Sequence, residues 1–221
     1  MSSKIKWILA SASPRRRELL TQIGLSFEVV VSEADENIAE KLSPGELVER
    51  LSLIKAGAVR DYLSVDEADN KPVGDGEPGE SETAGDNYAA DGLPYAVIGA
   101  DTVVYHEGEI LGKPKDEEDA FRMLRALSGA THSVFTGVSI LLPDETVTFH
   151  SETKVTFDEL SDEEIRAYIA SGEPMDKAGA YGIQGLGGAF VTGIEGEYAN
   201  VVGFPIGEFC RILRKKGLFG Y

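Results

Sequence analysis

The chain has 221 residues, 42% of them hydrophobic, which is enough for a sizeable core, and we expect a single domain over residues 1–221. Its formal net charge of −17 predicts repulsion from nucleic acid and from anionic membranes, so we expect neither as a partner. No apolar run approaches the roughly 18 residues of a transmembrane helix, and no signal peptide is evident, which favours a cytoplasmic protein. The single cysteine, Cys210, excludes an intramolecular disulfide, and we expect it to be buried.

The first predicted elements are a buried strand at 6–10 and a helix that begins at Ser13 and Pro14. Serine is a preferred N-cap residue, and proline fits the first helical position because its missing N–H has no intrahelical partner. Three arginines at 15–17 follow, although the positive end of the helix dipole disfavours cations. Free amides, guanidinium groups and the hydroxyls of Ser11 and Ser13 together predict a phosphate site. A solvated basic patch is the alternative.

A second strand is predicted at 27–31, and a helix from Ser43 to about Leu63 begins with the capping box Ser43-Pro44-Gly45-Glu46. Lys55 lies on the apolar side of this helix, where an ammonium group needs a partner or an aqueous cleft. The alternative is a lysine whose stem packs while its charged head reaches solvent. The expected apolar stripe of the helix consists of Leu47, Leu51, Ala58 and Tyr62.

Residues 64–93 differ from the rest of the chain in composition. They contain nine acidic residues against one lysine, together with five glycines and two prolines. This composition predicts a mobile or disordered segment, which we interpret as a tolerated acidic insertion within the domain. A regulatory or partner-binding role is the alternative.

A buried strand is predicted at 95–105, and it contains an aspartate in the middle of an apolar run. Such an aspartate is costly unless it is paired, ligated or exposed in a cleft, so Asp101 is the best candidate for a catalytic carboxylate. The alternative is an aspartate that caps a turn. Beyond a turn around Gly108, Lys113 precedes Pro114, which restricts its backbone and predicts a stiff loop.

The remaining pattern predicts a mixed α/β sheet rather than a strictly alternating parallel one. The three histidines of the chain share no metal-ligand spacing, and we expect each to be structural or exposed. The predicted elements are helices at 116–128 and 161–172, strands at 133–142 and 147–157, a hairpin of strands at 190–194 and 198–202, and a closing helix from 205.

Four segments, taken together and in order, resemble the signature blocks of the Maf family of nucleoside triphosphate pyrophosphatases. They are Ser11-Ala12-Ser13-Pro14-Arg15-Arg16, Gly99-Ala100-Asp101-Thr102, Gly112-Lys113-Pro114 and the glycine-rich segment from Lys177 to Gly185. The resemblance implies an elongated mixed β-sheet with flanking helices that form two lobes around a nucleotide cleft, the ITPase-like architecture, and a homodimer. It covers nearly the whole chain except 64–93, where the family usually has a shorter connection.

The resemblance also implies roles for individual residues. Hydrolysis of a nucleoside triphosphate to monophosphate and pyrophosphate would use Asp101 as general base, with Mg2+ or Mn2+ held by Glu36 and Asp101. The sequence at 181–185 is similar to the branch that acts on dTTP and UTP, in which the glutamine helps to select the base. The implied site consists of Glu36, Lys55, Asp101 and Lys113 for catalysis, Ser11, Ser13, Arg15 and Arg16 for phosphate, and Thr102 and Gln184 for the base. The alternatives are a nucleotide-binding regulator of cell division with little turnover and a metal-dependent phosphatase acting on monophosphates.

Overall fold

A computed structural model describes residues 5–69 and 93–218 of the chain. Within these residues, seven strands form one sheet in the order β2-β1-β3-β5-β6-β7, and β4 pairs with β3. The strands are β1 (Lys6–Leu9), β2 (Phe27–Val29), β3 (Tyr95–His106), β4 (Glu109–Leu111), β5 (Thr131–Leu141), β6 (Thr146–Phe157) and β7 (Val191–Glu195).

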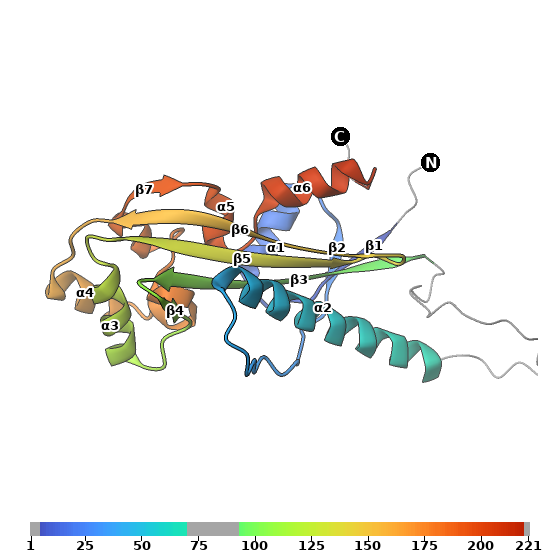
Figure 1. Cartoon of the computed structure of the whole chain (residues 1–221), viewed down its shortest axis with the longest axis horizontal. Helices are drawn as coiled ribbons and strands as arrows, with labels where there is room; N and C mark the ends of the chain where they lie inside the picture. Colours follow the sequence, from blue (N-terminus) through green and yellow to red (C-terminus); the bar gives the residue numbers. More distant parts are fainter. Residues whose placement is uncertain (1–4, 70–92, 219–221) are drawn as a thin grey trace, which may run out of the picture.

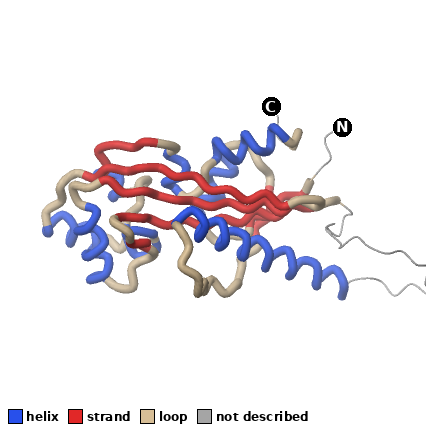
Figure 2. Tube along the Cα trace, in the orientation of Figure 1, coloured by secondary structure: helices blue, strands red, loops and turns tan. Residues whose placement is uncertain are grey.

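The sheet is mixed, as the sequence predicted. Strand β1 runs parallel to both β2 and β3, whereas the pairs β3–β4, β3–β5, β5–β6 and β6–β7 are antiparallel. Strands β3, β5 and β6 are 11 or 12 residues long and give the sheet its elongated shape (Figure 2). The mixed, elongated sheet with helices on its faces confirms the predicted fold class.

Helices cover both faces of the sheet (Figure 1). One face carries α2 (Pro44–Asp69), and the other carries α1 (Pro14–Gln22), α5 (Tyr198–Val202) and α6 (Ile206–Lys215). At the far end of the long strands lie α3 (Glu117–Leu127) and α4 (Asp162–Ala170), together with the short 3-10 helices η1 (Glu173–Asp176), η2 (Ala178–Ala180) and η3 (Leu186–Phe190).

Separate hydrophobic clusters give the molecule two lobes. In the first lobe, Leu20 of α1 and Phe209 of α6 pack on one face of the sheet, while Val59 of α2 packs on the other. In the second lobe, Leu124 of α3 and Ile165 of α4 pack against β4 and the ends of β5 and β6. Cys210 is buried in the first lobe, as expected, and no helix among the described residues is both long and apolar enough to span a membrane.

Helix α2 approaches the sheet very closely at two glycines. A Cβ atom on Gly99 of β3 would lie 2.2 Å from the Ser52 carbonyl oxygen, and one on Gly137 of β5 would lie 2.3 Å from that of Val48. No real Cβ atom tolerates such distances, so any larger residue would force the helix away. These glycines therefore set the distance between α2 and the sheet.

The structure corrects two expectations about α2. The helix does not end near Leu63 but continues to Asp69, because 64–69 contains neither glycine nor proline; the rest of the predicted acidic insertion, 70–92, lies outside the described residues. The predicted stripe is also wrong at Tyr62, which is 56% exposed, whereas Leu51 is buried and Leu47 and Ala58 are half-buried. The residues that face the sheet include Val48, Leu51, Ser52, Ala56 and Val59.

A third expectation, a strand at 198–202, is wrong. These residues form the short helix α5, and β7 pairs with β6 without a partner from this segment. The β-branched pair at 201–202 favoured a strand, but burial of Ala199 and Asn200 against the sheet determines the conformation instead. The turn after α5 brings the Gly203 carbonyl to the site described below.

Candidate active site

A cavity of about 930 Å³ lies between the two lobes. It is lined by the start of α1, the middle of β3, the loop after β4 and the glycine-rich segment after α4. All ten site residues inferred from the sequence line this one cavity, although they come from six different parts of the chain: Ser11, Ser13, Arg15, Arg16, Glu36, Lys55, Asp101, Thr102, Lys113 and Gln184.

The cavity opens where one edge of β3 lacks a neighbouring strand. The ladder with β1 ends at the pair Leu9 and Ile98, and the ladder with β4 begins at the pair Val104 and Leu111. Among the described residues, 99–103 therefore have no strand partner on this edge. Because successive side chains of a strand point to opposite faces, Asp101 and Thr102 reach different walls of the same cavity.

Asp101 and Lys55 form an ion pair at the wall next to α2. The distance from Lys55 Nζ to Asp101 Oδ1 is 2.5 Å, and their side chains are only 14% and 13% exposed. Glu36, in the segment between β2 and α2, lies on the same ammonium group, with its Oε2 2.9 Å from Nζ. Lys55 therefore has partners rather than a solvent-exposed head, and Asp101 lies within a continuous strand rather than capping a turn.

Arg16 is bound to the protein at the opposite wall. Its Nε donates to the Gly203 carbonyl at 2.9 Å, and its two terminal nitrogens donate to Ser11 Oγ at 3.3 Å and to Thr102 Oγ1 at 3.0 Å. Burial lowers the pKa of Arg16, and the nearby Asp101 charge partly opposes this effect. Arg16 thus fixes the Thr102 side chain. Much of the hydrogen-bonding capacity of Arg16 is therefore already used within the protein.

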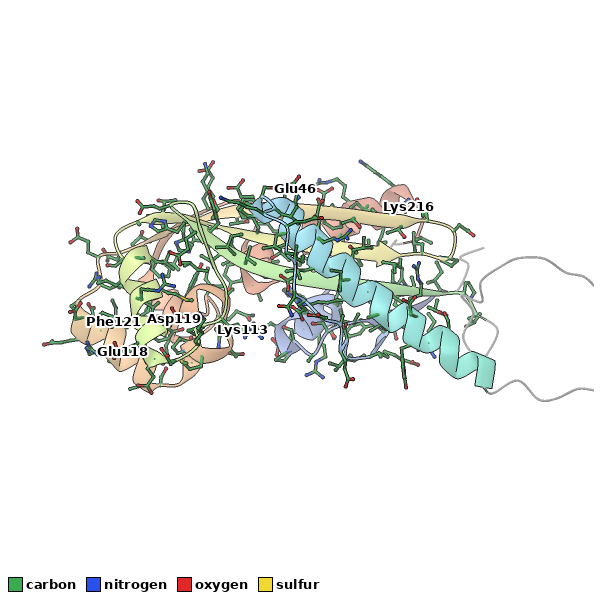
Figure 3. The ribbon with its side chains drawn as sticks, turned by 60° about the horizontal axis from the view of Figure 1, so that its bottom comes forward. Glu46, Lys113, Glu118, Asp119, Phe121 and Lys216 are labelled. Carbon is green, nitrogen blue, oxygen red and sulfur yellow. The ribbon has the colours of Figure 1, made fainter. Side chains whose placement is uncertain are left out.

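The other cations are more open to a ligand. Lys113 is exposed on its loop and makes no ion pair within 5–69 and 93–218; in Figure 3 it lies between the α3–α4 end and the N-terminal segment. Arg15 makes one long ion pair, 3.4 Å from its Nη1 to Asp176 Oδ2 across the cavity. Ser13 is the N-cap of α1, as predicted, but its hydroxyl makes no capping hydrogen bond. The first turn of α1 thus offers the amides of Arg15 and Arg16, which have no partner within the helix, together with the Ser13 hydroxyl.

The glycine-rich segment forms the floor on the second-lobe side, and Gln184 is exposed there. Sequence reasoning missed the cavity-lining residues Glu173 and Asp176, because Gly172-Glu173-Pro174 indicated only the end of a helix. It also assigned no role to Tyr181, whose hydroxyl lies 2.9 Å from His132 Nε2 beneath the cavity. All three histidines are, as expected, structural or at the surface, and the buried one is His132.

For a hard divalent cation, the site offers two carboxylate ligands. Among residues 5–69 and 93–218 there is no group of three or more histidine, cysteine, aspartate or glutamate side chains that could hold a metal ion. Glu36 and Asp101 nevertheless converge on one point, the Lys55 ammonium, and both offer oxygen ligands. Mg2+ is commonly held by one or two carboxylates together with substrate phosphates and water, so this donor set suffices.

The chain is similar to known proteins over most of its length. The model of the family described as Maf-like protein matches residues 6–216. A dTTP/UTP pyrophosphatase of Bacillus thuringiensis subsp. konkukian (strain 97-27) is 47% identical over 210 residues, which are 95% of each chain. One of Bacillus cereus (strain ATCC 10987 / NRS 248) is 48% identical over 210 residues, 95% of this chain and 89% of its own. The solved structure of the Staphylococcus aureus Ham1 protein, at 14% identity, covers 69% of this chain and 71% of its own with a TM-score of 0.41. The family match and these relatives show that the chain belongs to the Maf family.

Proposed function

We propose that the protein hydrolyses nucleoside triphosphates, dTTP and UTP above all, to nucleoside monophosphate and pyrophosphate, and so clears them from nucleotide pools. The observation that carries this proposal is the Lys55–Asp101 pair at an open strand edge, inside a cavity that is also lined by Arg15, Lys113 and the start of α1. The relatives at 47% to 48% identity, which are named dTTP/UTP pyrophosphatase, support the choice of substrate.

The triphosphate would bind between the start of α1 and the loop of Lys113. Its roughly four negative charges need neutralising before pyrophosphate can leave, and Arg15, Lys55 and Lys113 supply cations on three sides of the cavity. The free amides of α1 and the hydroxyls of Ser11 and Ser13 add neutral donors. A triphosphate would also compete with Asp176 for the guanidinium group of Arg15.

Asp101 would act as the general base. Its carboxylate would orient a water molecule and take its proton while the water oxygen attacks the α-phosphorus. The bond from this phosphorus to the bridging oxygen breaks, and its electron pair leaves with pyrophosphate. Lys55 holds the Asp101 carboxylate in place and is itself close to where the negative charge would develop.

We propose Mg2+ or Mn2+ as the cofactor, held by Glu36 and Asp101. When bound, such an ion would neutralise charge on the phosphate oxygens. The Lys55 ammonium now lies between the two carboxylates, so it would shift towards the phosphates when the carboxylates turn to the ion.

Thr102 and Gln184 would contact the base. An amide both donates and accepts hydrogen bonds, which suits the alternating carbonyl and N–H groups of uracil and thymine. Arg16, assigned to phosphate on sequence grounds, is placed so that it holds Thr102, and we propose this second role for it. We further propose a cytoplasmic homodimer that binds neither nucleic acid nor membrane.

The test is release of pyrophosphate and monophosphate from a panel of nucleoside triphosphates with Mg2+ or Mn2+. We expect turnover of dTTP and UTP, a loss of about a hundredfold or more in kcat for Asp101→Asn, and weaker base discrimination for Gln184→Ala. Asp61→Asn, at an exposed position of α2 away from the cavity, is the matched control. Binding without turnover would favour the regulator instead, and release of orthophosphate from monophosphates would favour a phosphatase.

A further inference from the structure

The segment that carries Gln184 is folded around one carboxylate, that of Glu173. The Leu186 amide donates to Glu173 Oε2 at 2.9 Å, and the Gly187 amide donates to Oε1 at 3.2 Å. A single side chain at the start of η1 thereby holds two amides that lie 13 and 14 positions further along the chain. These two bonds close the segment into a loop.

Tyr168 of α4 completes the arrangement. Its hydroxyl donates to Glu173 Oε1 at 2.9 Å and accepts from the Gly182 amide at 3.1 Å. The ring of Tyr168 is itself buried and packs edge to face against Phe190, the last residue of η3. Glu173 and Tyr168 therefore hold both ends of the segment 182–187, with Gln184 between them.

Three glycines make this close wrapping possible. A Cβ atom on Gly185 would lie 2.4 Å from Glu173 Oε2, and one on Gly187 would lie 2.7 Å from the Tyr168 hydroxyl. One on Gly182 would meet the Lys177 side chain at 2.6 Å. The glycines of this segment thus allow its backbone to approach Glu173 and its neighbours closely.

The charge of Glu173 argues against direct contact with the substrate. The carboxylate lines a cavity proposed to hold a triphosphate, which it would repel. Burial raises the pKa of Glu173, but the amides of Leu186 and Gly187, the Tyr168 hydroxyl and the Lys177 charge lower it more, so the pKa is lowered overall. Glu173 is therefore ionised at neutral pH and offers acceptors to the loop.

We infer that Glu173, acting with Tyr168, is a positioning residue that sets the conformation of the loop 182–187 and thereby the base selectivity of the enzyme. Loop formation itself does not depend on the proposed function, whereas the effect on selectivity rests on it. The reacting groups Lys55 and Asp101 lie on α2 and β3, outside this loop. Loss of Glu173 should therefore affect substrate binding and selectivity more than the chemical step.

The test compares Glu173→Gln with the wild type and with Glu163→Gln, an exposed position on α4 away from the cavity. A glutamine retains one acceptor oxygen but turns an NH2 group towards the other donors, so at least one loop bond is lost. We expect the KM for UTP to rise about tenfold, the ratio of kcat/KM for UTP over CTP to fall by a similar factor, and kcat to change less than about threefold. Tyr168→Phe should act in the same direction, and its effect should not add to that of Glu173→Gln because both belong to one hydrogen-bonded unit.

Hydrogen exchange supplies a measurement that does not depend on turnover. The Leu186 and Gly187 amides should exchange about tenfold faster in Glu173→Gln and unchanged in Glu163→Gln. A variant that merely loses thermal stability, with KM, selectivity and loop exchange unchanged at a temperature at which it is folded, would overturn the inference. Absence of pyrophosphate release by the wild type would instead contradict the proposed function and leave the exchange result to decide the role of Glu173.

Discussion

Lys55 Nζ on α2 lies 2.5 Å from Asp101 Oδ1 on β3, and this contact depends on how closely the helix lies on the sheet. Gly99 precedes Asp101 by two residues and faces the same helix. Its missing side chain lets the Ser52 carbonyl come to where a Cβ atom would be. The packing of α2 and the chemistry of the cavity are therefore coupled through the same few residues.

Gly99→Ala should reduce both stability and activity. The added methyl group would overlap the Ser52 carbonyl and the Ala56 amide, so α2 must shift and the Lys55–Asp101 distance must grow. Overpacking of this kind costs about 1–3 kcal/mol in unfolding free energy, and we expect a fall of about tenfold in kcat. Urea unfolding and pyrophosphate release measure the two effects.

Gly57→Ala is the control for this substitution. Gly57 lies in the same helix, and a Cβ atom added there would have no neighbouring atom within 4 Å. Alanine should therefore stabilise the protein by up to about 1 kcal/mol without loss of activity. Equal kcat values for Gly99→Ala and Gly57→Ala would contradict the coupling between helix packing and catalysis.

Arg16→Lys should impair the protein although the charge is kept. Lysine lacks the planar fork with which Arg16 reaches Gly203, Ser11 and Thr102 at once. We expect a loss of about 2 kcal/mol in stability and a lower selectivity for UTP over CTP, because the Thr102 hydroxyl is no longer fixed. Arg17→Lys, at an exposed position that does not line the cavity, should leave both measurements unchanged. If Arg16→Lys had the same stability and the same selectivity as Arg17→Lys, Arg16 would not be needed to hold the Thr102 hydroxyl in place.

Turnover should require a divalent cation, with Glu36 contributing to its affinity. A chelator should abolish pyrophosphate release, and Mg2+ or Mn2+ should restore it. Glu36→Gln removes one anionic ligand and should raise the metal concentration for half-maximal activity about tenfold. Glu33→Gln, exposed in the same segment, is the control. Full activity in the chelator, or equal metal curves for the two variants, would contradict the assignment.

The strand-to-helix turn and the buried aspartate were predictable because each depends on local chemistry. Ser13 and Pro14 define a helix start by backbone geometry alone, and Asp101 is conspicuous in an apolar strand. The segment 198–202 was not predictable in the same way, since its conformation depends on how Ala199 and Asn200 are buried against distant strands. Local propensity was overridden there by tertiary packing.

The same holds for the site: features set by the local sequence could be predicted, whereas features set by distant parts of the chain could not. The cations and carboxylates could be named from the sequence. The different roles of Arg15 and Arg16 could not, because they depend on the position of the Gly203 carbonyl. No pattern in the sequence pointed to Glu173 as a residue of the site. Its function depends on amides 13 and 14 residues further along, which only the folded loop brings back to it.

The buried imidazole of His132 predicts a loss of stability in mild acid. Burial, and to a smaller extent the charge of His106, lowers the pKa of His132 from 6.5 to about 4. Its Nδ1 has no hydrogen-bond partner within the described part of the chain, so a second ring proton would be unsatisfied. The folded protein therefore disfavours the imidazolium form, whereas the unfolded chain accepts the proton freely.

Above pH 6.5 neither state binds this proton, and the contribution to stability is fully present. As the pH falls from 6.5 towards 4 only the unfolded state is protonated, so the free energy of unfolding should decrease, by about 2 kcal/mol between pH 7 and pH 5 from this residue. His132→Gln cannot titrate but retains a group that can bond the Tyr181 hydroxyl. Urea unfolding at the two pH values should show a smaller decrease in this variant than in the wild type, with all other titrating groups cancelling in the comparison. Equal decreases in the two proteins would mean that His132 does not carry this pH dependence.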